Sequence, residues 1–507
     1  MRILVLVLAG LAFFHTPAAA EEPIDLVLRG GRVIDPETGL DATRDVGIRG
    51  GTIVSISETA LAGNEVVDVS GLVVAPGFID LHSHTPTPLG QRLQARDGVT
   101  TQLELEAGAY PVEDFGRQLR EQPRLNYGAS VGYGSVRLEV MAGVRAPHMI
   151  TDPIELLGLR GYWTAFRALF GSENSGFNRN ASASQRMAIR ELLLDGLAHG
   201  GIGIGLPLDY FSEAVDDAEL RMIFDVAASE RTLIFIHLRR GINGDPAGID
   251  EALGLARETG ASLHICHIQH NAMGNVDLFL RKIREARADE VDVTTEVLPY
   301  NAGSALISSA VFGRDWQTIF GITYSDVEWA ATGERFDEAM WNEYRRLYPD
   351  GQVVHHYLDE AWTRRALIEP GVIVVSDTLP LVSEDIKAAP HIGAFAKILG
   401  RYVRETPLLD LPTALAKMTL LPAQRLEAIA PVFARKGRLQ VGADADVTVF
   451  DPTQIVDRAT YPEPFRPSAG IPHVIVGGKF AVRDGESVAA AASGSWLRGP
   501  MEEPRSR

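Results

Sequence analysis

The stretch Pro76-Gly77-Phe78-Ile79-Asp80-Leu81-His82-Ser83-His84 decides the fold of this chain. A short apolar run ends there in two histidines that lie two positions apart. Because alternate residues of a β-strand face the same side, both imidazoles are predicted to point the same way. The pair therefore predicts two metal ligands at the exit of a buried strand. The alternative is two unrelated histidines on a half-buried strand.

Length, composition and charge predict a large folded protein that acts on a small molecule. The chain has 507 residues, of which 46% are hydrophobic and 22% charged, so it has enough apolar side chains for more than one structural unit. Its formal net charge of −18 argues against binding to nucleic acid or to an anionic membrane surface. A small-molecule substrate fits this composition, and the oligomeric state stays open.

The N-terminus has the pattern of a signal peptide. Arg2 is followed by an apolar run over residues 3–14 and by Pro17-Ala18-Ala19-Ala20, which offers a cleavage site. Residues 1–20 are therefore predicted to be removed, leaving a periplasmic or secreted protein with no membrane attachment. An N-terminal anchor helix is the alternative. Cys266 is the single cysteine, which excludes an intrachain disulfide and a thiolate metal cluster.

Strands and helices alternate over residues 76–430. Residues 233–237 predict a buried strand, residues 247–259 a helix, and residues 262–267 and 371–377 further strands. This alternation is typical of parallel β/α units, and its length suits an α/β fold of the (β/α)8 TIM-barrel type. Active sites of such barrels lie at the C-terminal ends of the strands.

Three other segments differ from this pattern. Residues 301–365 are rich in Trp, Tyr and charge, which predicts an insertion over the barrel mouth. Residues 21–75 and 431–488 read as short strands and turns, so a small β-sandwich built from both chain ends is predicted. Residues 489–507 are rich in Ala, Gly and Pro and are predicted to form a flexible tail.

Two acidic residues share one face of the strand over residues 100–108. By strand parity Glu104 and Glu106 point to the same side, and two carboxylates inside a barrel are costly unless they bind a cation. Glu106 lies nearer the strand end and is the preferred ligand, with Glu104 as its neighbour or alternative. An edge strand with a solvated acidic face is the competing interpretation.

Further candidates lie at the ends of later strands. His237 ends an apolar strand, and a core histidine is the alternative. His267 is preferred over its neighbours His264 and His270, and Cys266 is expected to be a small core residue. Asp377 follows the apolar run Val372-Ile373-Val374-Val375 and Ser376, and it is predicted to accept a proton unless it caps a helix.

These residue types predict metal-dependent hydrolysis. Imidazole nitrogens and carboxylate oxygens suit one or two zinc ions, which lower the pKa of water to roughly 7. Asp377 is then expected to take the proton from this water and to return it to the leaving nitrogen of an amide. The predicted ligands are His82, His84, Glu106, His237 and His267.

The chain resembles the amidohydrolase superfamily over about residues 24–485. More narrowly, it resembles the N-acyl-D-amino-acid deacylases and, among them, a D-glutamate deacylase subgroup. The motifs that carry this resemblance include Gly30-Gly31-Arg32-Val33-Ile34-Asp35-Pro36, Pro76 to His84, Asp97-Gly98-Val99-Thr100-Thr101, Leu103 to Gly108, Asn126 to Gly132, Leu399 to Glu405, Lys417-Met418-Thr419, Leu421-Pro422-Ala423 and Ala443-Asp444-Ala445-Asp446-Val447.

The resemblance implies a zinc-dependent barrel with a composite β-sandwich that cleaves N-acyl-D-amino acids. It assigns His82 and His84 to the first strand, His237 to the fifth, His267 to the sixth and Asp377 to the eighth.

The chain departs from the family pattern at several positions. Many D-aminoacylases have a cysteine near Ala107, whereas Glu106 would be the ligand here. Tyr133 follows Gly132 where Gly-His is common, and Thr85-Pro86-Thr87-Pro88 follows His84. There is no lysine near residues 201–205 to form a carbamylated bridge, which weighs against a hydantoinase-like site.

The leading hypothesis is an exported N-acyl-D-amino-acid deacylase, with an acidic side chain as a candidate preference. Arg239 and Arg240 follow His237 and are candidate substrate-binding residues, because a guanidinium binds a carboxylate through two parallel bonds. A D-amino-acid dipeptidase and a cyclic-amide hydrolase are alternatives on the same scaffold. A non-catalytic periplasmic binding protein is a third, against which Asp377 argues.

Overall fold

The structure of the chain is a computed structural model that describes residues 22–148, 176, 178–212, 214–381, 383–384 and 391–501. The predicted signal peptide lies outside these described residues. Among the described residues, no helix is both long and apolar enough to cross a membrane.

Eight parallel strands form the predicted (β/α)8 barrel, which is confirmed. The two edge strands meet just beyond their ends, where Ser83 bridges to Thr378 and the Asp377 amide donates to the His82 carbonyl at 2.9 Å. In sheet order the strands are β6 (Phe78–Asp80), β7 (Val99–Ala109), β8 (Asn126–Gly132), β9 (Ile204–Pro207), β10 (Leu233–His237), β11 (Ser262–Ile265), β12 (Val293–Val297) and β17 (Val372–Val374).

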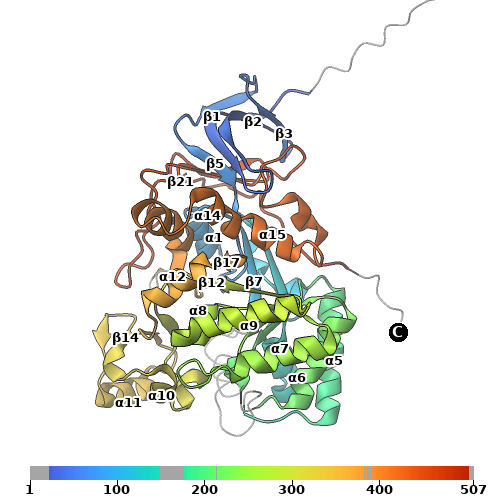
Figure 1. The fold of residues 1–507 in the computed structure, drawn as a ribbon, viewed down its shortest axis with the longest axis vertical. Helices are drawn as coiled ribbons and strands as arrows, with labels where there is room; N and C mark the ends of the chain where they lie inside the picture. The colour runs from blue at the N-terminus through green and yellow to red at the C-terminus, as the bar shows by residue number, and fades with distance from the viewer. Residues whose placement is uncertain are drawn as a thin grey trace, which may run out of the picture.

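Amphipathic helices cover the outside of the barrel (Figure 1). The helix over Val276–Ala288 shows why. It buries Val276, Phe279, Leu280 and Ile283, which recur at the three- and four-residue spacing of one helix face. The barrel helices are α1 (Pro88–Ala95), α2 (Tyr133–Ala142), α5 (Ala183–Ala198), α6 (Asp217–Ser229), α7 (Ala247–Thr259), α8 (Ile268–Ala272), α9 (Val276–Ala288), α12 (Glu360–Ile368), α13 (Ala394–Lys397), α14 (Leu411–Met418) and α15 (Leu420–Leu426).

A second sheet is built from both ends of the chain, as predicted, and lies beyond one end of the barrel (Figure 1). Its strands surround one apolar core to which Leu28, Val46, Val449 and Ile475 contribute. The strands are β1 (Leu26–Asp35), β2 (Leu40–Arg49), β3 (Thr52–Ser57), β4 (Glu65–Asp68), β5 (Val73–Pro76), β18 (Val447–Phe450), β19 (His473–Val476), β20 (Lys479–Arg483) and β21 (Glu486–Ser487).

Asp446 joins this sheet to the barrel. Its Oδ2 accepts from Asn126 Nδ2 at 2.9 Å and from Lys436 Nζ at 2.7 Å, and its carbonyl accepts from the Gly77 amide at 2.9 Å. Because β5 runs into β6 through Gly77, these bonds fix the strand that leads to the two histidines.

An aromatic insertion separates β12 from α12. It has its own buried cluster, in which the rings of Phe312, Trp316 and Trp341 contact one another with centroids 5.0–5.7 Å apart. Its elements are β13 (Gly303–Leu306), α10 (Trp316–Phe320), β14 (Val327–Trp329), β15 (Glu334–Arg335), α11 (Glu338–Leu347) and β16 (Gln352–His355).

The segment after Val488 differs from the flexible tail that was predicted. Through Met501 it lies extended against the starts of β8 and β9, where the Leu497 amide donates to the Tyr127 carbonyl at 2.7 Å. Gly494 and Gly499 allow backbone to approach backbone there, since a Cβ on Gly494 would lie 2.0 Å from the Leu125 carbonyl oxygen. A composition rich in small residues therefore indicates close packing in this case.

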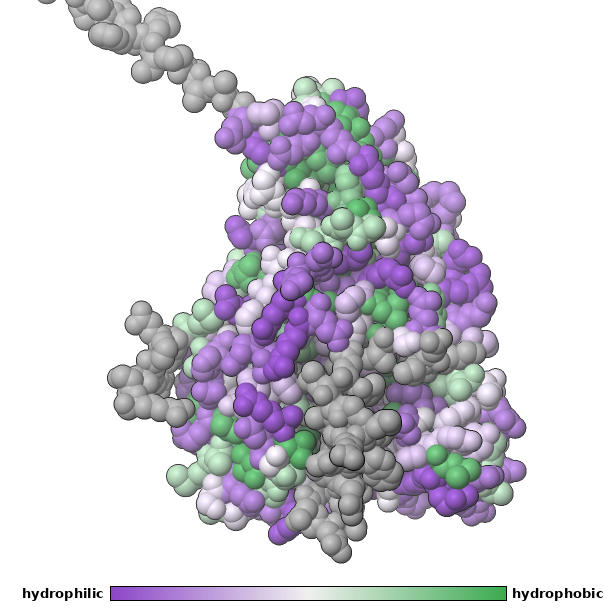
Figure 2. Space-filling model, turned by 180° about the vertical axis from the view of Figure 1, so that it is seen from behind, coloured by the Kyte–Doolittle hydropathy of each residue, from purple (hydrophilic) through white to green (hydrophobic). Residues whose placement is uncertain are grey.

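The face shown in Figure 2 is mainly hydrophilic, with apolar residues in small separate groups. Among the described residues, the exposed large hydrophobic side chains are scattered over the chain, which is ordinary for a folded protein.

We predict that Gly494→Ala lowers the free energy of unfolding by about 1–3 kcal/mol, because the added methyl group would overlap the Leu125 carbonyl. Gly254→Ala is the control. It lies in α7 with no heavy atom within 4 Å of the added Cβ, and should stabilise the protein by up to about 1 kcal/mol. Urea unfolding measures both, and equal stability of the two variants would contradict the packed segment.

Candidate active site

The two histidines of the opening motif lie just beyond β6, and their rings converge. His82 Nε2 and His84 Nε2 are 3.1 Å apart, and both side chains are buried. Strand parity had predicted that they share a face. Their Nε2 atoms define the centre around which the other candidate residues lie.

Glu106 occupies the middle of this cluster. Its Oε2 lies 3.3 Å from His82 Nε2 and 3.5 Å from His84 Nε2. Its Oε1 lies 2.9 Å from His237 Nδ1 and 2.9 Å from His267 Nε2. One carboxylate from β7 thus spans two pairs of histidines from opposite sides of the barrel.

His267 is the member of its trio that reaches the centre. His264 lies on β11 and contacts Glu296 at 2.8 Å, whereas His270 contacts the Tyr357 hydroxyl at 2.8 Å. The strand-end position of His267 explains the difference, because His264 is three residues earlier and His270 lies within α8.

Asp377 follows β17 and faces the first pair of histidines. Its Oδ1 lies 3.5 Å from the Nε2 atoms of both His82 and His84. Asp377 has φ of 51° and His267 has φ of 29°, a region that non-glycine residues seldom adopt. Backbone strain of this kind clusters at functional sites, because the surrounding structure must hold it in place.

Behind each of the two opening histidines lies a buried carboxylate and a further histidine. Glu104 Oε2 lies 2.8 Å from His84 Nδ1 and 2.8 Å from His148 Nε2. Glu104 therefore contacts the far side of the His84 ring, whereas Glu106 contacts the side that faces the centre.

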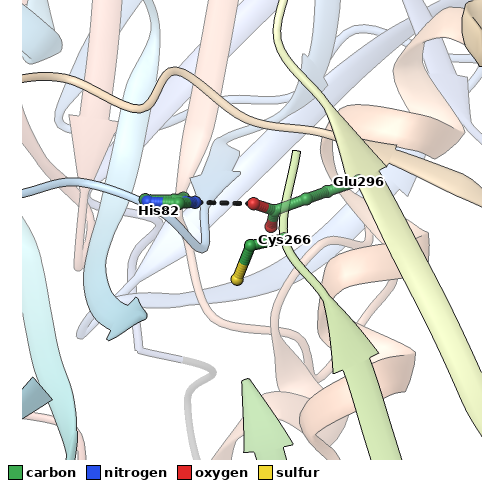
Figure 3. A group of neighbouring side chains, drawn as sticks. All are labelled: His82, Cys266 and Glu296. Atoms are coloured by element: carbon green, nitrogen blue, oxygen red, sulfur yellow. Dashed lines mark hydrogen bonds and ion pairs between the residues drawn. The ribbon is translucent and has the colours of Figure 1, made fainter. Parts of the chain in front are cut away.

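Glu296 contacts the far side of the His82 ring in the same way. Its Oε1 lies 2.6 Å from His82 Nδ1 (Figure 3). Its Oε2 lies 2.8 Å from His264 Nε2. A carboxylate on Nδ1 fixes the tautomer of a histidine and directs Nε2 toward a ligand. Both opening histidines thus present Nε2 to the centre with Nδ1 already engaged.

Cys266 lies beside this pair in Figure 3. Its Sγ falls within 4.8 Å of ligand atoms of His82 and Glu296. Burial raises the pKa of the Cys266 thiol well above its ordinary value, which favours the protonated thiol over the thiolate.

The centre strongly favours positive charge. Burial alone would lower the pKa of His82 and His84, but nearby carboxylates, chiefly Glu106 for His82 and Glu104 for His84, raise both pKa values well above the ordinary range. Burial alone would likewise raise the pKa of Glu106, yet His82 and His237 hold it well below its usual value. A cation would compete with protons for the same imidazole nitrogens.

The donor set fits a divalent metal ion. Glu106 with His82 and His84, and Glu106 with His237 and His267, each place three ligand atoms within 4.8 Å of one another. His82, His267 and Asp377 form a further such group. Imidazole and carboxylate together suit zinc and related transition metals.

The two arginines after His237 have different surroundings. Arg239 donates from Nε to Glu251 at 3.0 Å, from Nη2 to the Val215 carbonyl at 2.7 Å and from Nη1 to the Ser212 carbonyl. Arg240 Nη2 instead lies 3.1 Å from His237 Nε2, next to the centre. Arg240 is thus the better placed of the two for substrate.

Sequence reasoning did not single out Glu296 or His148. Glu296 had a signal, since it is an acidic residue inside the buried strand β12. His148 lies outside any strand or helix and contacts Glu104 across 44 residues, so the local sequence holds no comparable signal.

Known sequences similar to this chain are amidohydrolases. Residues 171–482 match the amidohydrolase family. The chain is 32% identical to N-acyl-D-glutamate deacylase of Alcaligenes xylosoxydans xylosoxydans, covering 90% of this chain and 93% of that protein. It is 29% identical to the D-aminoacylase of the same organism, covering 90% and 94%.

Comparison with solved structures agrees. The N-acyl-D-glutamate deacylase of Bordetella bronchiseptica, solved with zinc and a phosphonate inhibitor that mimics the tetrahedral intermediate, superposes with a TM-score of 0.74. That match covers 94% of this chain and all of the other, at 27% identity.

We predict that Glu106→Gln weakens metal binding far more than Glu104→Gln. Glu106 contacts four imidazoles at the centre, so the substitution removes the charge between the two histidine pairs. Glu104 contacts the far side of the His84 ring rather than the centre, and such outer partners alter metal affinity by roughly 10- to 100-fold. Calorimetric titration of zinc into both metal-free variants measures this. A larger loss in Glu104→Gln would transfer the ligand role to Glu104.

Proposed function

We propose that this chain, which belongs to the amidohydrolase family, hydrolyses the amide bond of N-acyl-D-amino acids with the help of bound zinc. The observation that carries the proposal is the Glu106 carboxylate between two pairs of histidines, with Asp377 beside one pair. The similarity to N-acyl-D-glutamate deacylase and D-aminoacylase along nearly the whole chain supports the substrate class.

We place zinc at up to two positions that share Glu106. His82, His84 and Glu106 would hold one ion, and Glu106, His237 and His267 would hold the other. When bound, zinc polarises a carbonyl oxygen and makes water a nucleophile at neutral pH. The cysteine of many D-aminoacylases is thereby replaced by a carboxylate in this chain.

Asp377 is the proposed proton carrier. Burial alone would raise the pKa of the Asp377 carboxyl. The charges of His82 and the neighbouring imidazoles outweigh burial and bring this pKa well below its ordinary value. Asp377 is therefore ionised and able to accept a proton from the attacking water. It then delivers this proton to the leaving nitrogen of the amide.

The backbone around Asp377 holds its carboxylate in place for both transfers. Its amide donates to the His82 carbonyl at 2.9 Å, and its own carbonyl accepts from His391 Nδ1 at 2.6 Å. The first bond links the proposed proton carrier to the end of β6, and the second links it to the helix that begins at His391.

We further propose that the chain is exported to the periplasm or secreted. Arg2, the apolar run over residues 3–14 and the Ala-rich segment before Glu21 support a cleavable signal peptide. N-terminal sequencing of the protein recovered from the exported fraction tests this.

We predict that the zinc-loaded protein hydrolyses N-acetyl-D-amino acids and leaves the L-enantiomers essentially intact. Asp377→Asn should fold, retain most of its zinc and lose at least about 10²-fold in kcat, the low end for general acid–base catalysis. Zinc analysis together with steady-state kinetics on a D and L panel measures both. Hydrolysis of cyclic amides but not of N-acyl-D-amino acids would contradict the proposed substrate class.

A further inference from the structure

Arg240 is a buried guanidinium beside the proposed centre. Its residue is 8% exposed, and its Cζ lies 5.1 Å from the ring centroid of Phe320 and 5.8 Å from that of Tyr357. The two rings fix the plane of the guanidinium by cation–π contact. Arg240 is therefore held rigidly within the barrel mouth.

The guanidinium has no close carboxylate partner among the described residues. Asp209 is the nearest, at 3.8 Å from Nη1, and its Oδ2 already accepts from Arg314 Nη2 at 2.9 Å. The Nε of Arg240 is buried without a hydrogen-bond partner in the described part of the chain. Buried polar groups normally have partners, so this donor points to an absent ligand.

His270 adds a second unpartnered atom on the same side of the centre. Its ring lies 5.4 Å from that of His267, and its Nδ1 contacts the Tyr357 hydroxyl at 2.8 Å. Within the described residues its Nε2 is buried and has no hydrogen-bond partner. Tyr357 thus contacts both Arg240 and His270 and brings the two groups to one place.

The charges near Arg240 do not balance. Asp209 Oδ2 lies 3.8 Å from Arg240 Nη1 and 2.9 Å from Arg314 Nη2, so the two guanidiniums share this one carboxylate. Two guanidiniums against one carboxylate leave one positive charge, and Glu106 is engaged by the four histidines. An isolated buried charge is costly, so a ligand with one negative charge fits this place.

We infer that Arg240 binds a carboxylate group of the substrate, with His270 as the second polar contact. The inference rests on the proposed function, because it places the recognition group beside the centre that would cleave the amide. A guanidinium with a fixed plane is suited to a carboxylate, which it binds through two parallel hydrogen bonds. The carboxylate is either the α-carboxylate or that of an acidic side chain.

The aromatic insertion contributes side chains to the surroundings of Arg240. Phe320, Tyr357 and Arg314 lie in or directly beside it, and each contacts Arg240 or its neighbours Asp209 and His270. The segment between β12 and α12 therefore forms one wall of the recognition site. Its substitutions should change substrate preference rather than metal content.

The test compares wild type with Arg240→Met on N-acetyl-D-glutamate, N-acetyl-D-glutamine and N-acetyl-D-leucine. We expect kcat/KM to fall by about 10- to 100-fold, mainly through KM, which is the usual effect of losing a charged hydrogen bond. A loss confined to the glutamate substrate assigns the side-chain carboxylate, and an equal loss on all three assigns the α-carboxylate. Values within about threefold of wild type on all three substrates overturn the inference.

Arg239→Met is the matched control, since Arg239 is adjacent but its donors are engaged by Glu251 and two carbonyls. It should lower Tm without changing KM or the ranking of substrates. Arg240→Met should keep the zinc content of wild type. If Arg240→Met does not fold, Arg240→Lys decides, because it keeps the charge but loses the fork, and an unchanged KM then overturns the inference.

Calorimetry separates this inference from the proposed function. D-Glutamate is titrated into zinc-loaded wild type and into Arg240→Met, and binding should weaken by at least about tenfold in the variant. If wild type hydrolyses none of the three substrates, the proposed function is wrong, yet the loss of D-glutamate binding still supports the carboxylate site. Equal binding by both proteins overturns the site.

Discussion

The carboxylate of Glu106 is buried at the end of β7, where its two oxygens face four imidazole rings. Burying an ionised carboxylate costs several kcal/mol unless opposite charge and hydrogen bonds compensate for it. In this barrel the compensation comes from histidines at the ends of three other strands. The barrel and its loops hold this carboxylate and the four imidazoles together.

The residues around these histidines hold the imidazole rings in place. Glu104 and Glu296 engage the far nitrogens of His84 and His82, so each ring has one orientation available. The Asp377 amide donates to the His82 carbonyl, which closes the barrel beside this proposed proton carrier. Left-handed backbone at Asp377 and His267 is maintained because both residues lie between packed strands and are bonded on several sides.

The sequence allowed the local features of the site to be predicted. Strand parity and position at strand ends singled out His82, His84, Glu106 and Asp377 as candidates, and the structure brings these residues together. Both signals depend only on neighbouring residues. The barrel followed from the alternation of apolar strands and amphipathic helices.

Long-range contacts could not be predicted in this way. Glu296 meets His82 across 214 residues, and His148 meets Glu104 through a loop without periodic pattern. The packing of the segment after Val488 was missed because small residues suggest a loose chain, although here they permit backbone contact with the barrel. Arg239 and Arg240 looked equivalent in sequence, and only the contacts with Glu251 and Phe320 distinguish them.

Anomalous diffraction at the zinc edge from crystals of the zinc-loaded protein tests the central claim most directly. We predict zinc within about 2.0–2.2 Å of a Glu106 oxygen and of the Nε2 atoms of His82 and His84, with any second ion between Glu106, His237 and His267. Zinc bound instead between Cys266 and Glu296, or between Glu104 and His148, would contradict it.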